Sequence, residues 1–128
     1  MAQVCKHIEA EVSDKIGRLA EVTDKLKDAG VNIVALLAWV EDGTGKLRMA
    51  VDDTDKACAA VSDMMDKCEC GEVVCASVPN RPGALNKIAH KLAEAGIAVH
   101  CVYATAGNGT QATIALVTDD NAKAARII

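Results

Sequence analysis

The chain has 128 residues, of which 51% are hydrophobic, and its formal net charge is -4 at pH 7. That hydrophobic content is enough for a packed core, so a disordered chain is excluded. Because acidic and basic residues are interspersed and only Trp39 and Tyr103 are aromatic, no surface for nucleic acid is predicted.

No membrane or secretory segment is predicted either. The first residues run directly into Lys6, His7 and Glu9, which interrupt the apolar core that a signal peptide needs. The longest apolar stretch, VNIVALLAWV at 31–40, is too short to cross a bilayer. We therefore expect a cytoplasmic protein.

The first part of the chain has the pattern strand, helix, strand, strand, helix. Apolar residues alternate over 4–12, which is typical of a half-buried strand, and a helical pattern follows from about residue 17 and stops at Gly30. Two strands, 31–41 and 46–52, are joined around Asp42-Gly43, a dipeptide that favours a tight hairpin turn. A second helix is expected over about 55–67, where the acidic residues of 52–55 cap it rather than bind metal.

The next strand, 70–78, leads into the segment SVPNRPGAL at 77–85. Asn80 is a preferred helix N-cap, Pro82 suits a first helical turn, and Gly83 permits close approach of a ligand or of backbone. The exposed amides of such a turn, together with the positive end of the helix dipole, form a site for a carboxylate or a phosphate. The alternative is a well-capped turn that binds nothing.

The chain repeats itself without a gap, residues 4–62 matching residues 70–128. Gly17 falls on Gly83 and Leu26 on Leu92, and the Asp42-Gly43 turn falls on Asn108-Gly109. Repetition at this length predicts one supersecondary unit used twice, over 1–69 and 70–128. The order of elements is that of the α+β, ferredoxin-like split βαβ unit, an antiparallel sheet with its helices on one face. No last strand is predicted after the second helix of the second repeat, which starts near Asn121.

The segment PNRPGAL, the helix that ends in LAEAGI and the strand after it resemble the ACT domain, a small regulatory module that binds amino acids. DKIGRLAEVTDKLKDAGVNI in the first repeat is similar to the same pattern. The resemblance covers nearly the whole chain and implies a free-standing tandem ACT protein with no enzyme attached and no cofactor. It also implies that a regulated enzyme or another protein is the downstream partner.

The resemblance further implies that ACT units pair side by side and that the ligand lies in the seam between the corner of one unit and the second strand of the other. The more complete seam uses Asn80, Arg81, Pro82, Gly83, Ala84 and Leu85 with Asn32 and Ile33. A weaker second site would use Asp14, Lys15, Ile16 and Gly17 with Ala98. The second site is weaker because Ala98 offers no side-chain hydrogen bond, the proline is missing, and the Asp14 carboxylate competes with a ligand carboxylate.

No catalytic or metal site is predicted. None of His7, His90 and His100 has an acid or a nucleophile at a recognisable spacing. The six cysteines are expected to be free thiols, and the single residue between Cys68 and Cys70 is too short a spacing for a structural zinc pair. A purely structural or protein-interaction module without a small ligand is the alternative function.

Strand 31–41 does not alternate, so both faces of it are apolar. We place Leu36 on the open face of the sheet, and Val73, Cys75 and Val102 extend the corresponding surface in the second repeat. So much apolar area predicts a homodimer that forms through the open sheet faces. Acidic residues at Leu36 and Val102 are then expected to separate the two chains.

Overall fold

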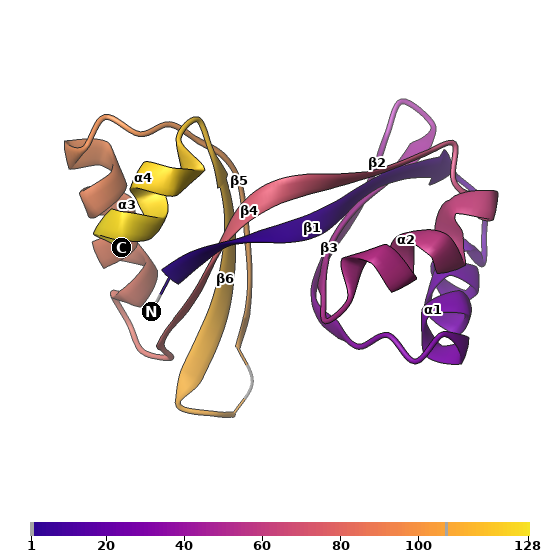
Figure 1. The fold of residues 1–128 in the computed structure, drawn as a ribbon, viewed down its shortest axis with the longest axis horizontal. Coiled ribbons are helices and arrows are strands. Elements are labelled where there is room, and N and C mark those ends of the chain that lie inside the picture. The colour runs from indigo at the N-terminus through magenta and orange to yellow at the C-terminus, as the bar shows by residue number, and fades with distance from the viewer. Residues whose placement is uncertain (1, 107) are drawn as a thin grey trace. The chain divides into compact units, whose positions relative to one another are not determined.

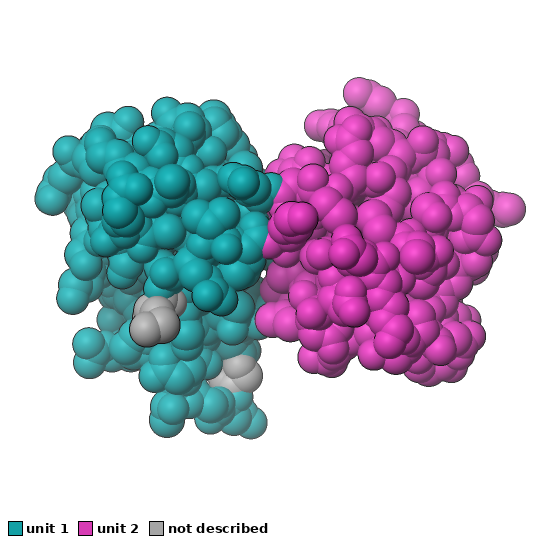
Figure 2. Space-filling view, viewed as in Figure 1, with its two compact units in different colours: residues 1–5, 72–128 teal, residues 6–71 magenta. Residues whose placement is uncertain are grey.

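The computed structural model describes residues 2–106 and 108–128. The chain divides into two compact units, which Figure 2 shows in different colours. Unit 2 consists of residues 6–71 and holds the first repeat, whereas unit 1 consists of residues 1–5 and 72–128 and holds the second repeat. The sequence predicted a division into 1–69 and 70–128. In the structure, residues 1–5 belong to the unit that holds the second repeat, and the first repeat ends at residue 71 rather than at residue 69.

Unit 2 has the ferredoxin-like order of elements. Its strands lie in the order β2-β3-β1-β4, with β3 antiparallel to both of its neighbours. The elements are β1 (Ala2–Ser13), α1 (Arg18–Asp28), β2 (Ile33–Glu41), β3 (Thr44–Val51), α2 (Thr54–Val61), a short 3-10 helix η1 (Ser62–Met64) and β4 (Lys67–Pro79). Only residues 6–13 of β1 and 67–71 of β4 belong to this unit.

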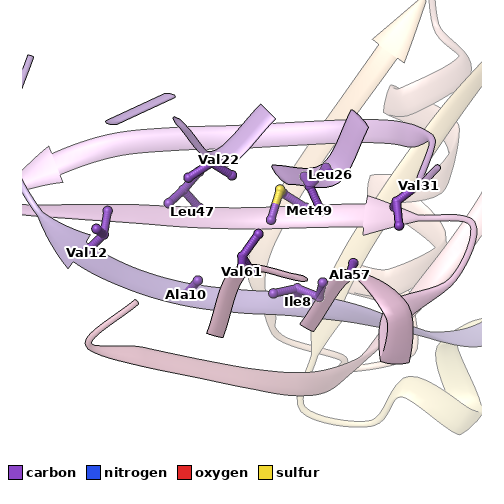
Figure 3. Packing of buried hydrophobic residues seen from close by; sticks show 10 residues of the cluster. All are labelled: Ile8, Ala10, Val12, Val22, Leu26, Val31, Leu47, Met49, Ala57 and Val61. Atoms are coloured by element: carbon purple, nitrogen blue, oxygen red, sulfur yellow. The ribbon is translucent and has the colours of Figure 1, made fainter. Parts of the chain in front are cut away.

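The core of unit 2 lies between its two helices and one face of the sheet. Val22 and Leu26 are four residues apart and so share one face of α1, where they pack with Met49 of β3 (Figure 3). The remaining buried members are Ile8, Ala10, Val12, Val31, Leu47, Ala57 and Val61. Both helices therefore cover the same face, as the sequence predicted.

Unit 1 repeats this arrangement, and its fourth strand comes from the start of β1. It consists of residues 72–79 of β4, α3 (Ala84–Glu94), β5 (Val99–Ala106), β6 (Gln111–Thr118), α4 (Asn121–Ile127) and residues 1–5. The strand order is β1-β4-β6-β5, and α3 and α4 lie on one side of the strands (Figure 1). The strand that the second repeat lacks is thus supplied by residues far from it in the sequence.

The two repeats correspond with one insertion rather than without a gap. Helices α1 and α3 begin at Arg18 and Ala84, 66 residues apart. The N-caps of α2 and α4 are Asp53 and Asp120, 67 residues apart, and each accepts a hydrogen bond from a backbone N–H three residues later. The acidic segments at these two helices are therefore structural caps, as predicted for 52–55. The second repeat contains one extra residue before β6, its last strand.

The extra residue falls in the second hairpin. In the first hairpin Asp42 and Gly43 have φ of 51° and 76° and form the predicted two-residue turn between β2 and β3. In the second repeat β5 ends at Ala106 and β6 begins at Gln111, so the connection is longer than the two-residue turn predicted at Asn108-Gly109.

The structure corrects the expected faces of β2 and β5. Leu36 lies opposite Met49 and packs against the core of unit 2, and Val102 lies opposite Leu116, a core residue of unit 1. Both side chains are therefore on the helix-covered face and not on the open one. The reason is a β-bulge in each strand, between Ile33 and Ala35 in β2 and between Val99 and Cys101 in β5, because one extra residue reverses the alternation of every side chain that follows.

The open face of unit 2 is charged rather than apolar. Lys46 forms ion pairs with Glu41 at 2.9 Å and with Glu11 at 3.4 Å, and Arg48 contacts Glu9 at 3.1 Å. In unit 1, Val73, Tyr103 and Ala115 lie on the open face but are already buried in the single chain. The large exposed apolar surface expected from the sequence is therefore not present at these positions.

None of the helices described is long and apolar enough to span a membrane.

Candidate functional site

The corner of unit 1 formed by residues 80–85, here called the Arg81 corner, joins β4 to α3. The backbone N–H of Asn80 donates to Thr110 O at 2.9 Å, which fixes the end of β4 against the start of β6. Gly83 is the N-cap of α3 with φ 90°, and no side chain caps the helix. The first amide of α3, that of Ala84, donates to Arg81 O at 3.3 Å, so the amides of Leu85 and Asn86 are the ones that suit another acceptor.

The expected N-cap was wrong. Asn80 lies ahead of the helix, and its side-chain Nδ2 donates to Gly109 O at 3.2 Å in the β5–β6 connection. The residue before α3 has a left-handed backbone conformation. Glycine adopts this conformation more readily than asparagine does, so Gly83 takes the N-cap position. Asn80 instead fixes the corner against the hairpin.

A cavity of about 570 Å³ lies at the Arg81 corner. Arg81, Lys87 and Lys91 line it, and no acidic residue is among its lining residues in the described part of the chain. Of the corner residues assigned from the sequence, Arg81, Pro82, Gly83 and Ala84 line the cavity, Asn80 and Leu85 do not, and the two lysines were missed. Lys87 and Lys91 follow Gly83 by one and two helical turns, so their spacing alone places them on the face of α3 that continues the corner.

Asn32 and Ile33 belong to unit 2, at the start of its second strand. Asn32 is exposed, and it lines a groove of about 410 Å³ together with Ile33, Lys27 and Thr23. The Asn32 backbone N–H donates to Asp52 Oδ1 at 3.0 Å, while its carbonyl accepts from the Asp52 N–H at 3.2 Å. These two hydrogen bonds with Asp52 fix the backbone of Asn32 and hold its side-chain amide at the surface.

The equivalent corner of unit 2, residues 14–17, is here called the Lys15 corner. Gly17 has the same φ of 90° as Gly83 and also begins its helix without a side-chain cap. Asp14, Lys15 and Gly17 line a cavity of about 280 Å³ that also includes Trp39. Ile16, also assigned to this site by the sequence, is fully exposed at 101% and is not among the lining residues.

Two of the three cations that line the Lys15 corner, Arg18 and Lys46, are already paired. Arg18 donates to the Ser13 hydroxyl at 2.7 Å and to Glu21 at 3.2 Å, and the only other lining cation besides Lys15 is Lys46, which is paired with two glutamates. Ala98, assigned to the same site, is exposed in unit 1, and its backbone N–H donates to Asp119 Oδ1 at 3.0 Å. The Lys15 corner is thus smaller and less positive than the Arg81 corner.

Comparison with protein-family models and with curated proteins gives no match. Among solved structures, protein BT0572 from Bacteroides thetaiotaomicron is 32% identical, with a TM-score of 0.87 over 98% of this chain and 87% of that one. The ligand-free regulatory subunit of aspartate kinase from Thermus thermophilus gives a TM-score of 0.73 at 14% identity, over 98% of this chain and 93% of that one. The chain belongs to the ACT domain family.

A third structure contains this fold within a longer chain. This ACT protein matches aspartate kinase from Clostridium acetobutylicum over 99% of its own length and 33% of the kinase, with a TM-score of 0.61 at 14% identity. At that identity the match shows the fold alone.

The titratable residues outside the two corners of this ACT protein do not form a metal site. Among the described residues, no group of three or more histidine, cysteine or acidic side chains is arranged to hold a metal ion. His7 is buried and lies 3.1 Å from Glu9, which in turn contacts Arg48. Burial lowers the pKa of His7 despite the opposing effect of Glu9, so this histidine is neutral at pH 7.

Proposed function

We propose that this protein is a non-catalytic regulatory module that binds a free amino acid at the Arg81 corner. The cavity there carries the proposal, since it combines a suitable volume of about 570 Å³ with three basic side chains and no acidic one among its lining residues. A ligand that bears a carboxylate is the chemical class that this charge distribution favours.

The two charges of an amino acid need different partners. The α-carboxylate suits the uncapped N-terminus of α3, where the amides and the helix dipole favour an anion, with Arg81 as a possible bidentate partner. The α-ammonium needs oxygen acceptors. The family resemblance supplies them from the second strand of the other ACT unit, so we propose that Asn32 completes the site and that Ile33 borders it.

The regulatory role is supported by two similar solved structures, both of which are regulatory subunits of an enzyme. Regulatory subunits of aspartate kinase from Thermus thermophilus and Thermus flavus share this fold, with TM-scores of 0.73 and 0.65. We propose that this protein likewise changes the activity of an enzyme or the assembly of another protein when its ligand binds. The Lys15 corner with Ala98 is proposed as a second and weaker site.

Replacing Asn80 or Asn32 by alanine is expected to weaken ligand binding by about 1–3 kcal/mol, roughly 5- to 150-fold in Kd. Asn32→Ala removes the proposed acceptor of the ligand ammonium, and Asn80→Ala removes the hydrogen bond to Gly109 O that fixes the Arg81 corner. A thermal-shift screen of the standard amino acids identifies the ligand, since a ligand that binds only the folded state raises Tm. Isothermal titration calorimetry then compares the variants.

Asn86→Ala is the matched control, because it removes an exposed asparagine amide from α3 and leaves Asn32 and the hydrogen bond from Asn80 to Gly109 O unchanged. It should bind the ligand as the wild type does. Unchanged affinity in both Asn80→Ala and Asn32→Ala would contradict the proposed seam. A screen in which no amino acid raises Tm would favour the interaction module without a small ligand.

We also propose a homodimer through the open sheet faces, which rests on the half-buried Leu37 and Trp39 of β2 and not on the wider apolar surface expected from the sequence. Its test uses two positions on β2: Leu37, which lies opposite Arg48 on the open face, and Val40, which is 57% exposed on the other face. Sedimentation should give a dimer for the wild type and for Val40→Glu, and a monomer for Leu37→Glu. A wild-type monomer at micromolar concentration would rule this assembly out.

A further inference from the structure

Three cysteines of unit 2 lie together although they are separated in the sequence. Cys58 is on α2, and Cys68 and Cys70 are at the beginning of β4. The Sγ atom of Cys58 lies 3.0 Å from that of Cys68 and 3.9 Å from that of Cys70. Cys58 is therefore the common neighbour of two other thiols.

The surroundings hold two of these thiols in place and leave the third accessible. Cys58 and Cys68 are half-buried and pack against the core of unit 2, whereas Cys70 is exposed. Helix α2 is itself fixed by the buried residues Ala57 and Val61 and by the Asp53 cap. The short distance between Cys58 and Cys68 is thus set by the packing of the helix on the strand.

We propose that Cys58 and Cys68 form a reversible disulfide and that the exposed Cys70 is the thiol through which an external disulfide, such as glutathione disulfide, enters the reaction. A disulfide has its sulfur atoms about 2 Å apart, so the two thiols need to approach by about 1 Å. The product would link α2 to β4 across the short connection that contains η1.

The exchange balances in three steps. The Cys70 thiolate attacks glutathione disulfide, forms a mixed disulfide and releases one glutathione thiolate. The Cys58 thiolate then attacks Cys70 Sγ and releases the second glutathione, and the Cys68 thiolate attacks Cys58 Sγ and releases Cys70. The two electrons lost by Cys58 and Cys68 reduce one glutathione disulfide, and the two protons from their thiols end on the two glutathione molecules.

Proximity rather than activation of the thiols carries this proposal. Burial raises the pKa of Cys58 and of Cys70, so both are mostly protonated at neutral pH and the exchange is slow. A structural zinc ion explains the cluster less well. Thiolates on a tetrahedral zinc ion are about 3.8 Å apart, further than Cys58 and Cys68 are.

The remaining cysteines provide internal comparisons. In unit 1, Cys5 and Cys75 interact with each other, and burial together with Cys5 raises the pKa of Cys75 to about 11. Cys101 is half-buried on β5, which is the edge strand of unit 1. Cys101→Ser is therefore a control that changes one thiol of similar exposure outside the cluster.

The test is incubation of the full chain with glutathione disulfide, followed by alkylation of free thiols, digestion and mass spectrometry. The wild type should yield one intramolecular link between the peptides of Cys58 and Cys68, and Tm should rise and return to its starting value after reduction. Cys101→Ser should behave as the wild type does. Full alkylation of Cys58 in the treated wild type, or a link confined to Cys5 and Cys75, would overturn the proposal.

Two further variants separate the roles of the thiols. Cys58→Ser should lose every link within the cluster and accumulate glutathione on Cys70, while its unchanged Tm under reducing conditions shows that it folds. Cys70→Ser should form the same Cys58–Cys68 link, but on the order of tenfold more slowly. An unchanged rate in Cys70→Ser would overturn the role of Cys70, and a Cys58–Cys70 link as the only product would overturn that of Cys68.

Discussion

Replacing Gly83 by valine should abolish amino-acid binding at the Arg81 corner. Gly83 lines the cavity, has φ 90°, and no heavy atom lies within 4 Å of the position that a Cβ would take there. The branched side chain would therefore stand in the open space in front of the α3 amides. It would also disfavour the left-handed backbone conformation by about 1–2 kcal/mol, which turns the same amides away from the ligand.

Gly17→Val separates these two causes, because Gly17 has the same φ of 90° and the same open surroundings in the other unit. Both variants carry a similar backbone cost, so their losses of stability in urea unfolding should be similar. Calorimetry should show that the stronger binding, at the Arg81 corner, is lost only in Gly83→Val, whereas Gly17→Val affects the weaker site proposed at the Lys15 corner. If Gly83→Val bound the ligand normally, the site would have to lie elsewhere, and loss of binding in both variants would favour a general effect of backbone strain.

Much of the fold could be predicted from the sequence because its signals are local. The spacing of Val22 and Leu26 identifies the buried face of α1, and Asp42-Gly43 identifies the turn between β2 and β3. The repeat then transfers each assignment from one half to the other. The ferredoxin-like order of elements follows from these signals alone.

The errors arose where one residue changes the outcome. The bulge between Ile33 and Ala35 reverses the faces of β2, and a strand that is apolar at both odd and even positions contains no sign of it. The sequence also contains no sign of the extra residue in the second hairpin. Gly43 matches Gly109 without a gap, and this match conceals the one-residue offset between β3 and β6. Side-chain positions that depend on register therefore require the structure.

The candidate site was predicted in part. Arg81 and Gly83 were assigned to the corner because a strand-to-helix corner has a recognisable composition. The N-cap of α3 was assigned to Asn80 rather than to Gly83 because several residues of the corner are suitable N-caps. The cysteine cluster could not be predicted, since Cys58 and Cys68 meet only when α2 packs beside the start of β4. Likewise, nothing local indicates that the first residues of β1 complete the sheet of unit 1.

Leu92→Ala should lower the free energy of unfolding by about 2–5 kcal/mol, the usual cost of removing a large side chain from a close-packed core. Leu92 is 1% exposed on α3 and packs with Ile88, Ile114 and Leu116 in the core of unit 1. Leu26, at the equivalent position of unit 2, is also 1% exposed, so Leu26→Ala should be similarly costly.

The matched control is Leu85→Ala on the same helix, where the side chain is 46% exposed, and its cost should be well below that of Leu92→Ala. Urea unfolding measures the three free energies, and amide hydrogen exchange locates the loss. Because each unit has its own core, Leu92→Ala should weaken protection first in β6, and Leu26→Ala first in β3. Equal losses for Leu92→Ala and Leu85→Ala would contradict the packing of α3, while an equal loss of protection in both units after either change would show that the two cores unfold together.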